Sequence, residues 1–417
     1  MRNFMKKKLA GLLLLTALFS QCGMNLSKDG EPFLDLSRDK LLYPENISRF
    51  LARLDKLKGE DSLLRIIQIG DSHIQMGYFS GEVRDMLQTR FGGTGRGFFF
   101  PNGLCKGYNP VGMNIISTGN WECEKITNLD AKVPMGVVGM AMYTQDAAVS
   151  ITVGFKSGKQ EVKTVSILHG TIAGNYTIGC AGASVETRAF SEKSEITVIT
   201  LPKAAEELTI DFKQEAGSGT PLVIYGLSVN TPATSGIDYN AFGVSGGQYK
   251  YFAKNTPLLL EQIKAFKPDL VIVSLGSNDC YDKQLTLKGY REMLQTFIRN
   301  MRAVSPNTEF LLTTPPDTQF EESKPVSLSI VNESILETAK KEHCTVWDFY
   351  TVMGGFDAMK KWQELELGNK DGLHLSTKGY YVQGQLLALA LARALEERSP
   401  GNGWLPKVEA SVKETLR

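Results

Sequence analysis

The sequence predicts a three-layer α/β fold, in which a doubly wound parallel sheet is interrupted by an inserted β-sandwich or jelly-roll domain. Three observations predict this fold. Strand-like and helix-like segments alternate in 63–100 and again in 235–398. The strand-like segments in these two regions are continuous apolar runs, as in parallel strands that are buried on both faces. The intervening region, 101–234, contains short β-branched segments with no helical periodicity.

The first 22 residues predict an export signal. A basic cluster at Lys6–Lys8 precedes an apolar stretch and a small-residue region that ends at Cys22. The apolar stretch is shorter than a membrane-spanning helix requires. Cys22 is a candidate for the lipidated first residue of a mature lipoprotein, and the alternative is cleavage nearby without lipidation. We therefore expect an exported protein, periplasmic or an outer-membrane lipoprotein, that contacts the membrane only through an anchor at Cys22.

The segment 23–100 is expected to form the first part of the α/β domain. The run "LLRIIQIG", 63–70, predicts a buried parallel strand. The segment "YFSGEVRDMLQTRF" then predicts a helix that is closed by Gly92 and Gly93.

The region 101–234 is expected to form the inserted β-rich domain. Its strand-like segments are "AVSITVGF", "KTVSILHG", "NYTIGC", "SEITVITL", "ELTIDFKQ" and "PLVIYGLSV", separated by Gly, Ser, Asn or Lys. Their even spacing without helices favours a sandwich or jelly roll. Export permits disulfides, and Cys105 and Cys123 are the best candidate pair because both fall in one irregular segment. Cys280 and Cys344 lie beside predicted strands and are expected to be buried thiols.

The region 235–398 completes the α/β domain. It predicts further strands at "LVIVSLG", "EFLLTTPP" and "CTVWDF", and a last helix from about Thr377 to Glu397. One helix face is marked by residues spaced three and four apart: Leu287, Tyr290, Leu294, Phe297 and Met301. The polar tail, 399–417, is expected to be loosely attached.

The composition excludes several classes of function. The formal net charge is +1, and no basic cluster beyond Lys6–Lys8 supports nucleic-acid binding. Four histidines and no CxxC motif exclude the commoner zinc patterns. We therefore expect no metal, no cofactor and no nucleic-acid partner.

Three polar clusters follow predicted strands or precede the last helix. They are Gly70-Asp71-Ser72-His73, Gly276-Ser277-Asn278-Asp279 and Asp371-Gly372-Leu373-His374. Open α/β sheets place their functional sites at the carboxyl ends of the strands. These clusters are therefore the candidate active site.

The residue types in these clusters are those of a serine nucleophile and its partners. Ser72 would attack, His374 would accept its proton, and Asp371 would orient the imidazole. The amide of Asn278 could donate to an oxyanion. Each residue also has a structural interpretation, because Ser72 could cap a helix, Asn278 could form a turn and Asp371 could start a helix. Their joint occurrence in this order favours the catalytic interpretation.

A second serine also matches a catalytic pattern. The run Gly243-Val244-Ser245-Gly246-Gly247 fits G-x-S-x-G, in which the serine follows a strand directly. The preceding "SGIDYNAF" predicts only a poor strand, because it contains Gly, Asp and Asn. Ser245 is therefore the minor alternative to Ser72 as nucleophile.

The three clusters resemble the first, third and fifth blocks of the SGNH/GDSL hydrolases, whose domain is flavodoxin-like. The resemblance covers roughly 63–100 and 235–395. It implies the catalytic residues Ser72, Asp371 and His374, and an oxyanion hole formed by the Ser72 N–H, the Asn278 amide and a glycine. The stretch "NAFGVSGGQYKYF" loosely matches the block that supplies this glycine. Gly246 fits best, while Gly247 and Gly243 remain open.

A narrower resemblance concerns the substrate. The GDSH motif, the β-rich insertion and the export signal together resemble the peptidoglycan O-acetylesterases, in which the insertion is similar to a carbohydrate-binding module. The resemblance implies a metal-independent esterase that removes acetyl from a glycan such as peptidoglycan, at the muramic C6 hydroxyl. The alternatives are an acetylesterase for another polysaccharide such as xylan, a glycan O-acetyltransferase, and a non-catalytic carbohydrate-binding lipoprotein. Weaker candidates for substrate contact are His73, Trp121 and Tyr143.

Overall fold

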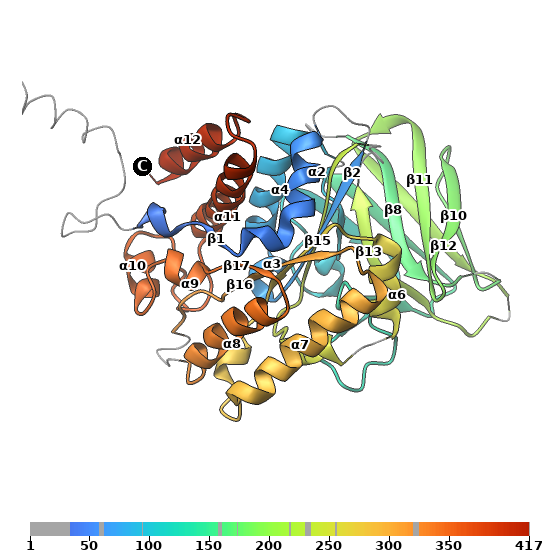
Figure 1. The fold of residues 1–417 in the computed structure, drawn as a ribbon. Helices are drawn as coiled ribbons and strands as arrows, with labels where there is room; N and C mark the ends of the chain where they lie inside the picture. Colours follow the sequence, from blue (N-terminus) through green and yellow to red (C-terminus); the bar gives the residue numbers. More distant parts are fainter. Residues whose placement is uncertain are drawn as a thin grey trace, which may run out of the picture.

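The computed structural model describes residues 34–416, with gaps at 58–61, 94, 157–160, 173, 217, 230–234, 255–256 and 320–324. The predicted export signal and Cys22 lie outside the described residues. Within these ranges no helix is long and apolar enough to cross a membrane. An α/β unit and a β-rich unit lie side by side (Figure 1).

The sheet of the α/β unit has six strands. In spatial order they are β1 (Leu41–Leu42), β17 (Thr345–Trp347), β16 (Glu309–Thr313), β15 (Leu270–Ser274), β2 (Leu63–Gly70) and β14 (Gly236–Gly243). The strands from β17 to β14 are parallel, and β1 pairs antiparallel with β17. The chain runs from β2 outward to β14 and then back past β2 to β15. The strand order therefore reverses between β2 and β15, where doubly wound sheets bind their ligands.

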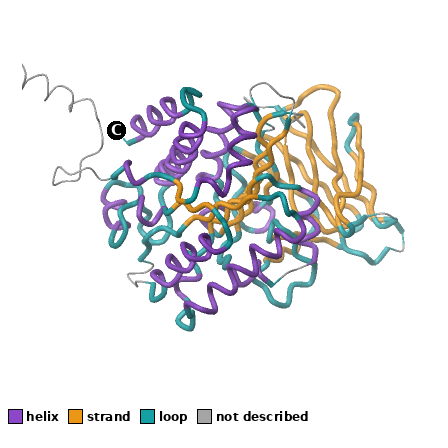
Figure 2. Tube along the Cα trace, in the orientation of Figure 1, coloured by secondary structure: helices purple, strands orange, loops and turns teal. Residues whose placement is uncertain are grey.

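Helices cover both faces of this sheet, as Figures 1 and 2 show. One layer contains α2 (Ser48–Lys56), α4 (Tyr78–Phe91) and α11 (Thr377–Arg398), and the other contains α6 (Pro257–Phe266), α7 (Leu287–Val304) and α8 (Leu328–Lys341). Alternate side chains of β2 divide between the two layers. Leu64 and Ile66 join the core of the first layer, while Ile67 and Ile69 join that of the second. The predicted three-layer α/β fold is confirmed.

The inserted unit is built from two antiparallel sheets. One contains β10 (Ser184–Ser191), β11 (Ser194–Ala205), β8 (Val162–Gly170), β13 (Leu222–Val229), β6 (Met140–Thr144) and β5 (Glu122–Lys125), with β3 (Phe98–Phe99) paired to β13. The other contains β4 (Met113–Ser117), β7 (Ala148–Phe155), β12 (Glu207–Gln214) and β9 (Tyr176–Gly179). Ile151 of one sheet and Ile167 of the other belong to one buried cluster, as in a sandwich.

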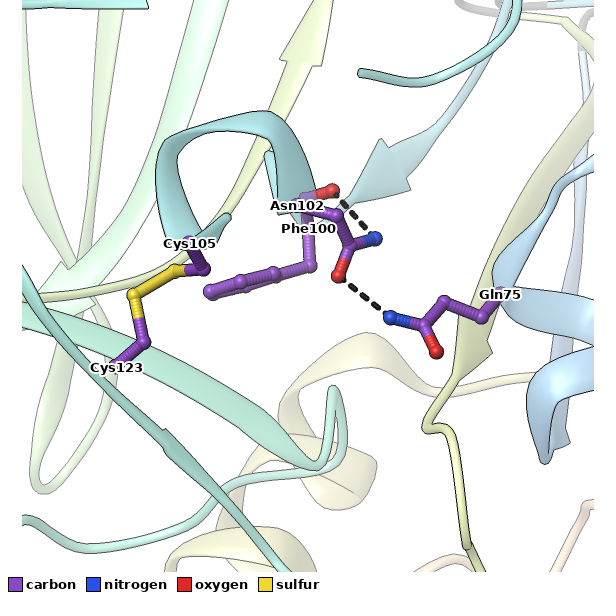
Figure 3. Close-up of a disulfide and its surroundings, with 5 residues drawn as sticks. All are labelled: Gln75, Phe100, Asn102, Cys105 and Cys123. Atoms are coloured by element: carbon purple, nitrogen blue, oxygen red, sulfur yellow. Dashed lines mark hydrogen bonds between the residues drawn. A yellow bond between two sulfur atoms is a disulfide. The ribbon is translucent and has the colours of Figure 1, made fainter. Parts of the chain in front are cut away.

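Shorter elements complete the described chain. They are η1 (Leu36–Arg38), η2 (Pro44–Ile47), α3 (Ser72–Gln75), η3 (Asn102–Cys105), α5 (Tyr249–Ala253), η4 (Asp279–Tyr281), α9 (Phe349–Val352), α10 (Ala358–Glu364) and α12 (Leu405–Thr415). Cys105 and Cys123 form a disulfide with Cα atoms 5.8 Å apart, which confirms that prediction (Figure 3). Cys280 and Cys344 are buried and free, also as predicted.

The expectation of a loosely attached polar tail is wrong. Most of the segment after Ser399 folds as α12, which packs against α11. Trp404 is 2% exposed, and its ring lies edge-on to Phe91 at 5.2 Å between centroids. Trp404, Val408 and Val412 are spaced by four, so one apolar helix face is buried although the rest of the segment is polar.

Candidate active site

Ser72 lies at a sharp turn from strand to helix. Strand β2 ends at Gly70, and Ser72 begins α3. Asp71 caps this helix, because its Oδ1 accepts the N–H of His73 at 3.0 Å. A Cβ at Gly70 would lie 2.2 Å from Ile74 Cγ1, so only glycine lets α3 pack so closely on the strand end. As the first helical residue, Ser72 has an N–H that no carbonyl within the helix can accept.

His374 connects Ser72 to Asp371. Its Nε2 lies 2.9 Å from Ser72 Oγ, and its Nδ1 lies 2.7 Å from Asp371 Oδ2. A carboxylate can only accept, so the proton of neutral His374 is on Nδ1. Nε2 is then free to accept the proton of the Ser72 hydroxyl, which is the arrangement that a general base requires.

Asp371 is held rigidly in its loop. Its Oδ1 accepts the N–H groups of Leu373 and His374, each at 2.9 Å. Gly372 has φ +68°, and a Cβ there would lie 2.2 Å from the carbonyl oxygen of Gln319, so the loop requires glycine. Burial favours a higher pKa for Asp371. The hydrogen bonds from the His374 side chain and from the two N–H groups outweigh it and hold the pKa below its ordinary value.

The turn after β14 presents one free amide. The Val244 N–H donates to the Gly70 carbonyl at 3.1 Å, and the Ser245 N–H donates to Gln75 Oε1 at 2.7 Å. The Gly247 N–H donates back to the Val244 carbonyl at 2.8 Å, which closes a β-turn. Gly246 occupies the third position with φ +80°, as a type II turn requires.

Among the described residues, no acceptor is bonded to the Gly246 N–H. The three neighbouring amides are all engaged, so Gly246 is the member of this turn that can serve an oxyanion. A Cβ at Gly247 would lie 2.8 Å from the Val244 carbonyl oxygen, and a Cβ at Gly243 would lie 2.0 Å from Gln75 N. Gly247 and Gly243 are thus needed for close packing rather than for a free amide.

Asn278 follows β15, the strand beside β2. Its Nδ2 donates to the Gly247 carbonyl at 3.1 Å, and Gln248 Nε2 donates to the main-chain carbonyl of Asn278 at 2.8 Å. A carbonyl can only accept, so the bond to Gly247 fixes which end of the amide is Nδ2. The second hydrogen of Nδ2 remains available for a substrate oxygen. The structure thus joins the Gly246 turn and the Asn278 loop into one assembly.

These features coincide with a known family. The GDSL-like lipase/acylhydrolase family matches residues 199–387, a span that includes Asn278, Asp371 and His374. The chain carries a GDSL/SGNH lipase–acylhydrolase domain. This family consists of carboxylic ester hydrolases. Ser72 lies outside the matched span because the inserted unit separates it from the other motifs, and the fold brings it back to them.

An esterase and a solved structure are among the known proteins that are similar to this chain. An isoamyl acetate-hydrolyzing esterase of Schizosaccharomyces pombe (strain 972 / ATCC 24843) is 26% identical over 172 residues, which span 39% of this chain and 65% of that esterase. A structure described as a peptidoglycan O-acetylesterase in action is 23% identical, with a TM-score of 0.71. The alignment covers 86% of this chain and 99% of that one, so the two share a fold over most of their length.

Two buried carboxyl groups lie beneath the site of the acylhydrolase domain. Burial raises the pKa of Asp71 to about 6, although hydrogen bonds from the His73 N–H and the Ser277 hydroxyl oppose this. Burial also raises the pKa of Asp279 to about 7, opposed by the Tyr249 N–H and reinforced by the charge of Asp71. Asp279 Oδ1 accepts the Tyr249 N–H at 3.1 Å. The carboxylate bonded to the His374 ring is that of Asp371, not that of Asp279.

His73 lies behind the site rather than in it. Its side chain is buried, and its Nδ1 lies 3.0 Å from the Tyr380 hydroxyl. Burial, and then the nearby His374, lower the pKa of His73 to about 3, so its ring is neutral. The burial of its side chain disfavours the weaker expectation that His73 contacts substrate, which stays a prediction. No local pattern around His73 indicates this contact, because α11 supplies Tyr380 from more than 300 positions away.

The aromatic side chains of the inserted unit differ in their exposure to solvent. Tyr143 is buried in β6, and its hydroxyl donates to Glu122 Oε2 at 2.5 Å, so it does not offer the exposed aromatic face that a sugar contact requires. Trp121 is half-buried, and its Nε1 donates to the Thr118 carbonyl at 3.1 Å. Tyr108 is 82% exposed in a loop of the inserted unit, where no periodicity in the sequence marks it.

Ser245 does follow a strand, contrary to expectation. Strand β14 pairs with β2 over its whole length despite its Gly, Asp and Asn residues, and the buried Asn240 side chain accepts the Phe98 N–H. In the described part of the chain, however, no histidine is bonded to Ser245. The histidine that lies within hydrogen-bond distance of a serine hydroxyl, among the residues that the structure describes, is His374, beside Ser72. In the same ranges, no three His, Cys, Asp or Glu side chains cluster as metal ligands.

Proposed function

We propose that this protein is a serine esterase that removes O-acetyl groups from a cell-envelope glycan, with peptidoglycan acetylated on the muramic C6 hydroxyl as its substrate. One observation carries the catalytic part. His374 Nε2 and Nδ1 lie 2.9 Å and 2.7 Å from Ser72 Oγ and Asp371 Oδ2. This is the geometry of a nucleophile, a general base and an orienting carboxylate.

The proposed reaction proceeds through an acetyl-enzyme. Ser72 Oγ attacks the acetyl carbonyl carbon while its proton passes to His374 Nε2, and Asp371 stabilises the imidazolium. The oxyanion accepts hydrogen bonds from the Ser72 N–H, the Gly246 N–H and Asn278 Nδ2. The tetrahedral intermediate collapses, and His374 returns the proton to the departing sugar oxygen.

The second half of the reaction repeats these roles with water. Water enters as the new nucleophile, loses a proton to His374 Nε2 and attacks the acetyl carbon bonded to Ser72. Collapse of this intermediate releases acetate and returns the proton to Ser72 Oγ. No step requires a metal or a cofactor.

Three features support a glycan substrate. The fold is similar, over most of the chain, to a structure described as a peptidoglycan O-acetylesterase. The inserted sandwich begins directly after α4 and offers exposed surface, including Tyr108, beyond what a small ester requires. The basic and apolar N-terminal segment would export the chain to the compartment that contains the cell wall.

The same N-terminal segment supports a lipid anchor at Cys22 and a periplasmic or outer-membrane location. Metabolic labelling with a radioactive fatty acid tests this. We expect label on the wild type and none on Cys22→Ser. Secretion of an unlabelled wild-type protein would leave export in place and overturn the anchor.

Acetate release decides the substrate. Purified protein is incubated with O-acetylated murein and with acetylated xylan, and Ser72→Ala serves as the blank. We expect release from murein that depends on Ser72. Turnover of xylan alone would overturn the peptidoglycan proposal but not the esterase mechanism. Acetyl transfer to an added glycan acceptor without free acetate would indicate a transferase, and no turnover of any acetyl ester would indicate a binding protein.

A further inference from the structure

Gln75 connects the nucleophile's helix to two other parts of the molecule. It is the last residue of α3, three positions after Ser72. Its Oε1 accepts the Ser245 N–H at 2.7 Å, and its Nε2 donates to Asn102 Oδ1 at 2.8 Å. Ser245 belongs to the turn that presents the Gly246 N–H, and Asn102 belongs to the inserted unit.

The donor and the acceptor of each of these hydrogen bonds follow from the main-chain group at which the chain of amides begins. The Ser245 N–H can only donate, so it must face the carbonyl end of the Gln75 amide. The NH₂ end of Gln75 then faces Asn102, whose oxygen must accept. The NH₂ end of Asn102 in turn faces the Phe100 carbonyl at 3.4 Å, a long bond that agrees with the same direction. The chain of amides therefore has one consistent polarity, and such chains strengthen each member.

The far end of this chain is covalently anchored. Asn102 and Cys105 are the first and last residues of the one-turn helix η3, and Cys105 is joined to Cys123 in β5. Figure 3 shows the Gln75 amide facing Asn102, with the disulfide on the same short helix. The disulfide therefore limits the movement of the side chain that Gln75 holds.

The other end of this chain of amides is the turn at residues 244–247, which Gln75 holds through the Ser245 N–H. The Val244 N–H is held by the Gly70 carbonyl, and the Gly247 N–H by the turn's own bond to Val244. The Ser245 N–H is exposed at the outside of the turn, and Gln75 is its partner. The rotation of the next peptide unit, which carries the Gly246 N–H, thus depends on how Gln75 holds Ser245.

We propose that Gln75 is a positioning residue that aims the Gly246 N–H at the oxyanion and couples this amide to the disulfide-anchored helix η3. This inference rests on the proposed function, because it assigns a role in the same reaction. Gln75 acts through Ser245 and does not itself touch the substrate. The inserted unit would thereby support transition-state stabilisation as well as any glycan binding.

The coupling has a defined kinetic consequence. An oxyanion bond forms only as the carbonyl oxygen gains charge, so misplacing its donor lowers kcat with little effect on KM. Complete loss of one donor costs about 10²–10³ in kcat. A misdirected donor retains part of its effect, and we expect a fall in kcat of about 10- to 100-fold, as for small misplacements of catalytic groups.

The test compares three variants on a small soluble acetyl ester. Gln75→Met keeps the length of the side chain but removes both hydrogen bonds, so kcat should fall by about 10- to 100-fold at nearly unchanged KM. Gln75→Glu keeps the acceptor for the Ser245 N–H and should retain most of kcat, because the Asn102 amide can turn to donate to it. Gln284→Met, at an exposed glutamine, is the control and should match the wild type.

Two further measurements separate positioning from a general structural role. The pH profile of Gln75→Met should coincide with that of the wild type, because the bonds among Ser72, His374 and Asp371 are intact. Asn102→Ala and the double variant Cys105→Ser/Cys123→Ser should each lower kcat in the wild type but add little in the Gln75→Met background, as expected for one coupled chain.

These experiments distinguish failure of the Gln75 proposal from failure of the proposed esterase function. If the wild type hydrolyses no acetyl ester, the proposed function fails. If the wild type is active and Gln75→Met retains full kcat, the positioning role of Gln75 is overturned while the esterase stands. A shifted pH profile, or additive effects of Gln75→Met and Asn102→Ala, would likewise overturn it in favour of a general loss of structure.

Discussion

His374 Nε2 and Ser72 Oγ lie 2.9 Å apart although 302 positions separate them in the chain. The sheet explains this proximity. Parallel strands present their carboxyl ends at one edge, and Ser72 follows β2 at the point where the strand order reverses. His374 precedes α11, which packs on α4, the helix that follows Ser72. The topology therefore places the His374 imidazole beside the Ser72 hydroxyl although the two residues lie far apart in the chain.

Replacement of Ser72 should abolish catalysis without unfolding the protein. In Ser72→Ala no nucleophile remains for His374 to activate, and the helix cap by Asp71 is unaffected. We expect no measurable turnover of an acetyl ester and an unchanged melting temperature. Ser245→Ala is the matched control, because it keeps the main-chain N–H that Gln75 accepts. Loss of activity in Ser245→Ala with activity retained in Ser72→Ala would exchange the two assignments.

Asn278 should contribute to the rate rather than to substrate affinity. Its Nδ2 is held by the Gly247 carbonyl, with one hydrogen left for the oxyanion. Asn278→Ala should therefore lower kcat by about 10²–10³. Asn278→Asp has the same shape but no N–H, and it should be at least as impaired. If kcat is unchanged in both variants while KM rises, the side chain binds substrate and is not part of the oxyanion hole.

Asp371→Asn isolates the orientation of the imidazole. The side-chain oxygen of asparagine can still accept the Leu373 and His374 N–H groups, so the loop should remain folded. An NH₂ group facing Nδ1 would favour the wrong tautomer, with the proton on Nε2. We expect kcat to fall nearly as far as in His374→Ala. A loss of less than about tenfold would mean that a Ser72–His374 dyad is sufficient.

Much of the fold was predictable because its strands have strong local signatures. Apolar and β-branched residues fill two of these segments, 63–70 and β15. Each segment is followed by small or polar residues, which are typical of a functional site or a tight turn. The three motifs gave Ser72, Asn278, Asp371 and His374 as a set. Their residue types, their order in the chain and their positions after predicted strands identified them together.

The remaining features depend on tertiary contacts that local patterns do not contain. Strand β14 contains Gly, Asp and Asn, and it is stabilised by pairing with β2 and by the buried Asn240 side chain. The choice of Gly246 as the candidate oxyanion glycine depends on which amides of one turn are already bonded. Tyr143 is buried in the apolar core of the inserted unit and His73 lies against Tyr380, and no periodicity reveals either environment.

The C-terminal helix should contribute to the stability of the whole domain. Trp404 is buried between α12 and the end of α4, edge-on to Phe91. Trp404→Ala should lower the free energy of unfolding by about 3–5 kcal/mol, the usual cost of deleting a large buried aromatic. Urea denaturation measures this, with Lys407→Ala on the exposed side of α12 as the control. Equal stability of the two variants would restore the interpretation of a loosely attached tail.

The buried carboxyl of Asp279 should make stability depend on pH. Its pKa is raised from 3.8 to about 7, mainly by burial, so between these values the folded protein holds a proton that the unfolded chain has lost. Stability contributed by this proton is present below pH 4 and is lost progressively as the pH rises to about 7.

Asp279→Asn removes the ionisation, while its side-chain oxygen can still accept the Tyr249 N–H. The free energy of unfolding is measured in urea at pH 5 and pH 8. The variant should be more stable relative to the wild type at pH 8 than at pH 5. Asp130→Asn, at an exposed position, should follow the wild type at both pH values. Parallel curves for Asp279→Asn and the wild type would show that Asp279 ionises at its ordinary pH and that the burial seen in the structure is relieved in solution.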